Sequence, residues 1–176
     1  DITSPVNDGF AEFTIDIKQG TFVTNEFVVD TSQPNQKFIL PNPYVDTSTL
    51  KVQVRDTLTS SSRKTYSQID NIVGISTHSE TFLIQEIQDE KYELLFGDGV
   101  LGKRLSNGNV INSTYIVTDG VGGNGVSNFS FAGKLVDNDG GLITSGISDI
   151  ITNERSRNGA EVESIDTIRN LSTRVY

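Results

Sequence analysis

Several residue types are absent or rare in this chain of 176 residues, and each absence excludes a kind of chemistry. Cysteine is absent, so neither disulfides nor thiolate metal sites can hold the fold together. Histidine occurs once, at His78, which excludes a metal centre built from two or three imidazoles. Methionine is absent even at position 1, and we therefore expect the chain to be a piece of a longer protein.

Basic residues are also scarce. The chain has 14 Lys and Arg against 23 Asp and Glu, which gives a formal net charge of −9. Nucleic acids and anionic membrane surfaces attract clusters of Lys and Arg, but no basic run here is longer than Arg63-Lys64 or Lys103-Arg104. We expect neither nucleic acid nor a membrane as a partner, and no apolar run is long enough to span a bilayer.

What the chain does contain is β-prone sequence, in which Val, Ile, Thr and Ser are interleaved with Asn, Asp and Gly. Alternation predicts that Phe13, Ile15 and Ile17 form the inner face of a half-buried strand. Strands are predicted at residues 10–17, 21–29, 37–40, 50–54, 82–87, 92–96, 109–118 and 129–135. Short strands at this spacing are typical of a sandwich or barrel. The predicted fold is mainly β (α+β), an antiparallel β-sandwich-like domain with a short C-terminal helix.

That helix is predicted near the end of the chain, where the spacing of apolar residues changes. Asn158 followed by Glu161 resembles a capping box. The apolar residues then recur at helical spacing, at Val162, Ile165, Ile168 and Leu171. A helix with this single apolar stripe is expected to pack on the sheet or on another subunit, which makes the stripe a candidate interface.

Three parts are expected along the chain. Residues 1–36 form a β-rich segment that continues from a longer protein. Residues 37–136 form the β-sandwich-like core. Residues 137–176 form a strand and the helix, which lead into a missing C-terminal segment.

The candidates for catalytic and metal sites have simpler structural explanations. A Ser-His-acid triad would need His78, which lies in a polar stretch without a nucleophile motif, so we interpret it as a loop residue. Asp137 and Asp139 have the alternate spacing of a calcium loop, but the later ligands of an EF-hand are missing. The residues before Gly140 also suit a tight turn. Calcium binding at Asp137 and Asp139 therefore stays open.

The acidic and glycine-rich segments also have simpler structural explanations. Glycoside cleavage needs two converging carboxylates, and a charge-rich strand edge or turn explains Glu86, Asp89, Glu90 and Glu93 more simply. The glycine runs at 97–99 and 122–125 do not open a helix with a Lys-Ser/Thr pair, which argues against a phosphate loop. We expect no catalytic residues, no cofactor and no enzymatic activity.

One block of sequence concentrates several turn signals. Its parts are, in order, Phe96-Gly97-Asp98-Gly99, Gly102, Asn107-Gly108, Gly120, Gly123 and Asn124. The pair Asn107-Gly108 predicts a type I′ hairpin, with the strand at 109–118 as its partner strand. Glycines permit positive φ at tight turns, and the Asp98 carboxylate can accept hydrogen bonds from backbone donors in its turn. We interpret these residues as architecture.

Together, the FGDG sequence, a glycine three residues later, the NG pair and a strand that ends in TDG…GN resemble the signature of baseplate-J-like proteins. That family includes the large wedge subunit of T-even-type phage baseplates, and the resemblance extends over residues 20–176. It implies a structural protein of the virion tail baseplate that is assembled in the host cytoplasm. The implied partners are copies of the chain itself, as a homodimer or through ring contacts, and other baseplate wedge proteins.

Two other classes of function remain as hypotheses. A carbohydrate-binding or adhesin-type module of a phage tail protein would suit a polar β domain, although Trp is absent and only 5 Tyr are present for stacking on sugars. A tail-associated hydrolase would have to depend on acids such as Glu93 or Asp98.

Overall fold

The computed structural model describes residues 6–7, 10–11, 13–71, 73–136, 139–143 and 150–161. Within these ranges the chain is mainly β, as the sequence predicts. Helical structure in the described residues is limited to two short 3₁₀ turns, η1 (Gln88–Glu90) and η2 (Gly120–Gly123). None of the helices in these ranges is both long and apolar enough to cross a membrane.

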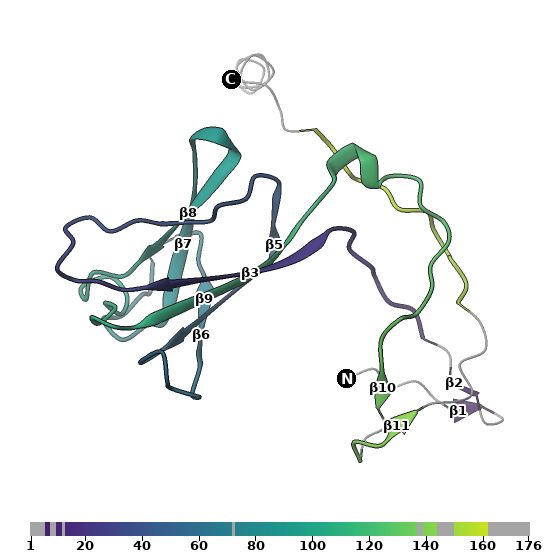
Figure 1. Ribbon diagram of the computed structural model, residues 1–176, viewed down its shortest axis with the longest axis horizontal. Helices are drawn as coiled ribbons and strands as arrows, with labels where there is room; N and C mark the ends of the chain where they lie inside the picture. Colours follow the sequence, from purple (N-terminus) through teal and green to yellow (C-terminus); the bar gives the residue numbers. More distant parts are fainter. Residues whose placement is uncertain are drawn as a thin grey trace.

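The main feature is one seven-stranded sheet that curves until it is nearly closed into a barrel (Figure 1). Its strands are β3 (Thr21–Val28), β4 (Phe38–Ile39), β5 (Val45–Arg55), β6 (Lys64–Gln68), β7 (Thr81–Ile87), β8 (Lys91–Phe96) and β9 (Val110–Val117). Their order is β3-β9-β5-β6-β7-β8-β4, and all neighbours are antiparallel except β6 and β7. Of the sandwich and the barrel that the strand spacing predicts, the sheet is nearer to a barrel.

The core lies inside this curved sheet. Successive side chains of a strand point to opposite faces, so each strand contributes alternate residues to the interior. On β5 these are Val52 and Val54, and on β9 they are Ile111, Ser113 and Tyr115, all of them buried. These residues lie on the strands predicted at 50–54 and 109–118, and Val110, on the other face of β9, is buried as well.

Aromatic rings fill the side of the barrel where the sheet does not close. The ring of Phe96 on β8 lies 5.7 Å from that of Phe38 and 5.8 Å from that of Tyr66, both edge to face. Phe38 on β4 also meets Phe27 on β3, with ring centroids 5.9 Å apart. Edge-to-face pairs of this kind stabilise a fold beyond the area that they bury. The two end strands are therefore joined by side chains where backbone pairing is missing.

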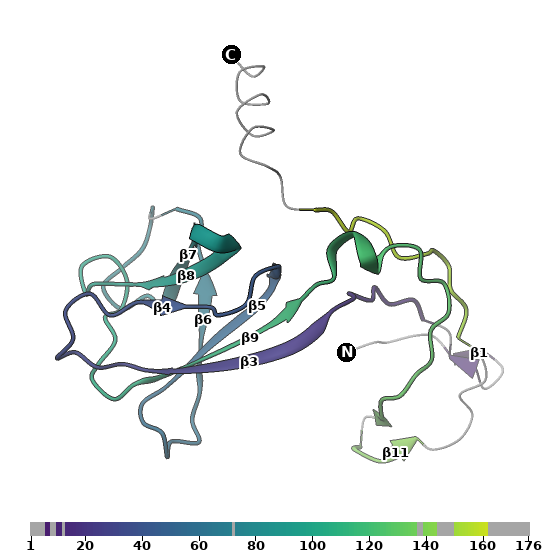
Figure 2. The same ribbon diagram turned by 45° about the horizontal axis from the view of Figure 1, so that its top comes forward.

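Beside the barrel lies an extended part of the chain, which we call the arm, made of residues 13–19, 124–136 and 150–161 (Figure 2). Its outgoing segment, 124–136, and its returning segment, 150–161, are held together by hydrogen bonds. Among these are Gly125 N–H to Ser156 O (2.8 Å) and Ser156 N–H to Val126 O (2.9 Å). Two small hairpins lie at this side of the molecule. They are β1 (Val6–Asn7) with β2 (Phe10–Ala11), and β10 (Leu135–Val136) with β11 (Leu142–Ile143).

Two predicted strands are wrong over most of their length, and both fall on the arm. The strand predicted at 10–17 is present only as β2, and Phe13, Ile15 and Ile17 are 45%, 53% and 59% exposed. The strand predicted at 129–135 is reduced to β10, at its last residue and the next. Alternating sequence buries a face only where a neighbouring strand completes a sheet, and no described strand pairs with residues 13–19.

Two other differences concern β6 and the predicted helix. The residue pattern does not predict β6, because only Tyr66 marks its buried face within a polar segment. Residues 158–161 are not helical, and Asn158 has a positive φ of 70°, so the helix does not begin at the predicted cap. The stripe Val162, Ile165, Ile168 and Leu171 lies outside the described residues.

Candidate functional site

The first part of the glycine-rich block forms a tight turn after β8. Gly99 and Gly102 have positive φ values of 93° and 83°, in the region that favours glycine. Gly99 N–H donates to Gly102 O (3.1 Å), and Gly102 N–H donates to Ser76 O (3.2 Å). A Cβ atom on Gly97 would lie only 2.3 Å from the carbonyl carbon of Gly102. The turn therefore joins β8 to the loop before β7 through a backbone approach that leaves no space for a side chain at position 97.

Asp98 organises the same turn through its carboxylate. One oxygen, Oδ1, accepts hydrogen bonds from Val100 N–H (2.8 Å) and Leu101 N–H (2.9 Å). The N–H groups of Leu101 and then Val100 hold the pKa of Asp98 below its usual range, because they favour the charged form. These bonds close the turn on itself, so the local geometry agrees with the architectural interpretation of the residue.

Replacing Asp98 by asparagine is expected to lower stability most clearly near neutral pH. An acid whose pKa is lowered in the folded state stabilises it above the unfolded pKa of about 3.9, and this contribution is lost as the pH falls through the folded pKa. Urea midpoints should therefore be lower for Asp98→Asn than for the wild type at neutral pH. The difference between the two midpoints should shrink below about pH 3. An equal difference at neutral and at acidic pH would contradict this role of the Asp98 charge.

The Asn107-Gly108 pair forms a turn, but the predicted type I′ hairpin is wrong. Positive φ is found at Gly108 (80°) and not at Asn107, and the turn is closed by Asn109 N–H to Ser106 O (3.0 Å). A positive φ only at the third position is typical of a type II turn. The preceding strand β8 pairs with β7 and β4, whereas β9 pairs with β3 and β5. The turn instead contacts the end of β3, since Gly108 N–H donates to Val29 O (2.8 Å).

The last part of the block joins the end of β9 to the returning segment of the arm. Asn124 and Gly159 exchange two hydrogen bonds, from Asn124 Nδ2 to Gly159 O and from Gly159 N–H to Asn124 Oδ1, each 2.8 Å long. Ser156 Oγ donates to Gly123 O (2.6 Å). A Cβ atom on Gly159 would lie 2.1 Å from Gly120 O. Gly120, Gly123 and Asn124 thus form a junction with residues 156–159.

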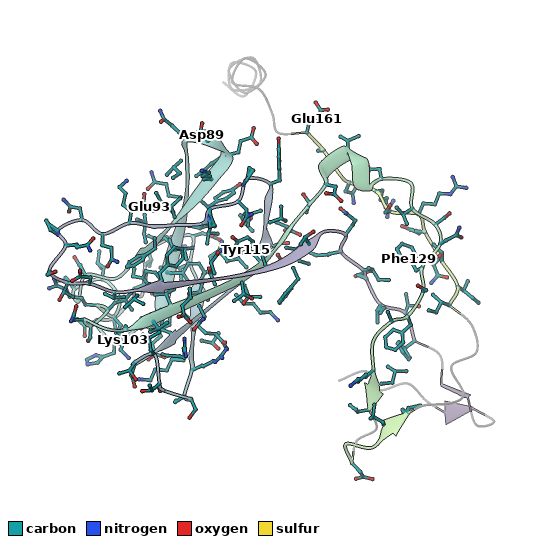
Figure 3. All side chains as sticks on the ribbon, viewed as in Figure 1. Asp89, Glu93, Lys103, Tyr115, Phe129 and Glu161 are labelled. Atoms are coloured by element: carbon teal, nitrogen blue, oxygen red, sulfur yellow. The ribbon has the colours of Figure 1, made fainter. Side chains whose placement is uncertain are left out.

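The block is therefore divided in space and does not make one site. Figure 3 shows Lys103, which follows the first turn, far from Glu161, which follows the junction, with Tyr115 of β9 between them. The first turn contacts the loop before β7, Gly108 contacts the end of β3, and the junction contacts residues 156–159. Each part fixes a connection between elements.

The acidic residues considered as a catalytic pair lie on the β7–β8 hairpin. Asp89 and Glu90 form its tip with positive φ values of 63° and 57°, which confirms the interpretation as a turn. Glu93 points elsewhere, and its carboxylate accepts a hydrogen bond from Lys37 Nζ (3.2 Å). The pKa of Tyr92 is raised by burial and, to a smaller extent, by the carboxylates of Glu86 and Glu90.

The hairpin borders a shallow hollow of about 240 Å³ between the barrel and the returning segment. Sequence reasoning does not find this hollow, because its residues come from four separated segments. It is lined by Tyr44, Val45, Glu86, Glu90, Tyr92, Thr118, Ala160 and Glu161.

The other candidate residues do not assemble into a described site. His78 is exposed in the loop before β7, and its Nδ1 lies 2.9 Å from Thr77 Oγ1. Asp137 lies outside the described residues, so the calcium hypothesis for Asp137 and Asp139 is not tested. Among the residues that the structure describes, no group of three or more His, Asp or Glu side chains is placed to hold a metal ion.

The fold and these contacts define a mainly β domain with a nearly closed barrel, glycine-dependent turns and an exposed arm. Comparison with known proteins does not narrow this class, since no protein-family model matches the chain and no curated protein matches it.

Proposed function

We propose that the chain is a structural, non-enzymatic component of a phage tail baseplate wedge, which associates with copies of itself and with other wedge proteins around the tail hub. The observation that carries the proposal is the sequence from Phe96-Gly97-Asp98-Gly99 to Gly123-Asn124, here called the FGDG-to-GN block, which resembles the baseplate-J-like signature. In this fold its residues shape turns and connect segments, a role that suits a scaffold. The proposal places the protein in the virion tail, assembled in the host cytoplasm.

The exposed apolar side chains of the arm support a role in assembly. Clusters of such side chains are typical of surfaces that another protein covers. On the arm, the large apolar side chains with 40% or more of their surface exposed are Phe13, Ile15, Ile17, Val126, Phe131, Val136, Ile150 and Ile151. A single extended layer cannot cover both of its own faces, so an added subunit would stabilise it.

Cross-linking of purified virions, followed by mass spectrometry, tests the proposal. Cross-linked peptides should place this chain beside copies of itself or beside other tail proteins. Its absence from virions would refute the assignment to a baseplate.

A carbohydrate-binding module is the second candidate, and the hollow beside the β7–β8 hairpin favours it. Tyr44, which is 52% exposed, and Tyr92 offer rings for stacking, and Glu86 and Glu90 offer acceptors for hydroxyl groups. Binding on a glycan array that disappears in Tyr44→Ala would support this function. A lack of binding at high protein concentration would exclude it.

A further inference from the structure

The free edge of β3 has the properties of a strand-addition surface. β3 is the first strand in the sheet order, and among the described residues only β9 pairs with it. The pairing runs without a bulge from Thr21↔Val117 to Val28↔Val110. Natural proteins usually shield an edge strand with charged side chains, above all lysine, with proline, with a bulge or by a very short length. The sequence of β3, TFVTNEFV, has eight residues without lysine, proline or a bulge, and Glu26 is its one charged residue.

The hydrogen bonds of β3 show which backbone groups point toward this free edge. Asn25 O accepts from Ser113 Oγ (3.5 Å), and Val29 N–H donates to Asn109 O (2.8 Å), so the odd-numbered residues face β9. In an antiparallel ladder the intervening residues direct their N–H and C=O groups to the other side. These are Phe22, Thr24 and Glu26, whose backbone groups have no hydrogen-bond partner within the described chain. Val28 follows, and its carbonyl accepts from Gln36 Nε2 (2.8 Å).

The residues of β3 are also self-complementary about Asn25. If a second copy of β3 lies antiparallel with Asn25 opposite Asn25, apolar residues face apolar residues at both ends and polar residues face polar ones in the middle. The facing pairs are then Phe22 with Val28, Val23 with Phe27, and Thr24 with Glu26. Phe22 and Val28 are 71% and 45% exposed in the single chain, and this register would bury each against the other.

The distribution of charge favours a second copy as the occupant of this edge. Two molecules of net charge −9 repel one another, so self-association needs a face without net charge. Glu26 is the one charged residue of β3, and it forms an ion pair with Arg55 on the neighbouring part of the sheet. In the register centred on Asn25, Glu26 lies opposite Thr24 and not opposite another Glu26. The pairing therefore avoids the repulsion of like charges in facing positions.

We propose that the free edge of β3 pairs antiparallel with the same edge of a second copy, across a two-fold axis at Asn25. Such an isologous pair uses both open edges and closes on itself, whereas a head-to-tail contact would leave one edge open. The backbone groups of Thr24 and Glu26 already point to the edge, so they pair with the second copy without rearrangement. The hydrogen bond from Gln36 Nε2 to Val28 O must break before Val28 can pair. The inference rests on the self-association proposed above and names its surface.

The decisive variant is Thr24→Pro, with Thr24→Val as its matched control. Proline removes an N–H that points away from β9 and blocks an incoming strand, so the ladder inside the barrel stays intact. Valine loses the same hydroxyl group but keeps the N–H. Molar mass measured by light scattering over a wide range of concentration should rise to that of a dimer for the wild type and for Thr24→Val. Thr24→Pro should remain monomeric at the same concentrations while its circular dichroism stays that of the wild type.

Cysteine cross-linking tests the register, and it also serves if Thr24→Pro does not fold. The chain has no cysteine of its own, so single replacements give unique thiols. Facing residues in a hydrogen-bonded antiparallel pair have Cα atoms about 5.5 Å apart, within the range of a disulfide. A mixture of Thr24→Cys and Glu26→Cys chains should form mixed disulfides faster than either variant alone. Equal rates, or no disulfide, would overturn this register.

The outcomes separate this inference from the proposed function. If Thr24→Pro dimerises like the wild type, the β3 edge is not the dimer interface, although the protein still self-associates. If the wild-type chain stays monomeric at all concentrations, pairing through the β3 edge is refuted as well. Cross-linking of virions still tests the baseplate assignment independently in both cases.

Discussion

Replacement of Gly97 by alanine is expected to destabilise the protein by about 3 kcal/mol, since it forces a side chain into a closely packed backbone contact. The added Cβ would lie 2.3 Å from Gly102 C and 2.5 Å from Gly102 O. Both are backbone atoms of a turn that is fixed by its own hydrogen bonds, so they cannot move aside as a flexible side chain would. The turn after β8 would have to open, and the contact that holds it to Ser76 would be lost.

Gly108→Ala is the matched control for this prediction. Gly108 has a positive φ of 80° but no atom within 4 Å of the position of its missing Cβ. Its replacement tests the backbone conformation alone and should cost about 1 kcal/mol. Urea denaturation of both variants measures the difference. If Gly97→Ala is no more destabilising than Gly108→Ala, the close approach of Gly97 and Gly102 does not limit the stability of the fold.

The strands with strict alternation could be predicted from the sequence because both of their neighbours exist in the chain. Val52 and Val54 on β5, and Ile111 and Tyr115 on β9, are buried as their spacing indicates. Residues 13–17 have the same alternation and are nonetheless exposed. The difference is the partner strand, which is a property of distant parts of the chain or of another molecule. Local periodicity identifies which face is apolar and cannot say whether anything covers it.

The turns could be predicted only in part, because they too depend on which strands pair. The positive φ of Gly108 follows from the residue type, since glycine has no Cβ. The hairpin expected at Asn107-Gly108 is wrong because strand pairing decides which strands a turn connects. A tight hairpin of this sheet lies at Asp89 and Glu90, where Asp tolerates positive φ but Glu gives no signal for it.

The candidate site was predictable in its residues and not in its geometry. The glycines of the FGDG-to-GN block were identified as turn residues, and Gly99, Gly102, Gly108 and Gly120 have positive φ. That Gly120 and Gly123 contact residues 156–160 follows only from the return of the chain along the arm. The open edge of β3 could not be predicted from the sequence either, because the order of strands in the sheet decides which strand lies at an edge.

Truncation of Phe82 to alanine is expected to have the largest effect of the single replacements considered, about 3–5 kcal/mol. Phe82 lies near the start of β7, an inner strand of the sheet, with 2% of its surface exposed. Its ring contacts that of Phe96, with centroids 6.3 Å apart. Alanine would leave a cavity beside Phe96, which is itself in edge-to-face contact with Phe38 and Tyr66. The packing that bridges the open side of the barrel would then lose its support.

Phe22→Ala provides the comparison, because Phe22 is 71% exposed on β3. At concentrations where the chain is monomeric, this variant should differ from the wild type by no more than about 0.5 kcal/mol. Urea denaturation followed by tyrosine fluorescence measures both variants, and an unchanged slope with denaturant would indicate that the unfolded states are comparable. A loss of 3–5 kcal/mol is a large fraction of the roughly 5–15 kcal/mol that stabilises a typical domain. If the two replacements cost the same, the interior of the curved sheet is not the main source of stability of the single chain.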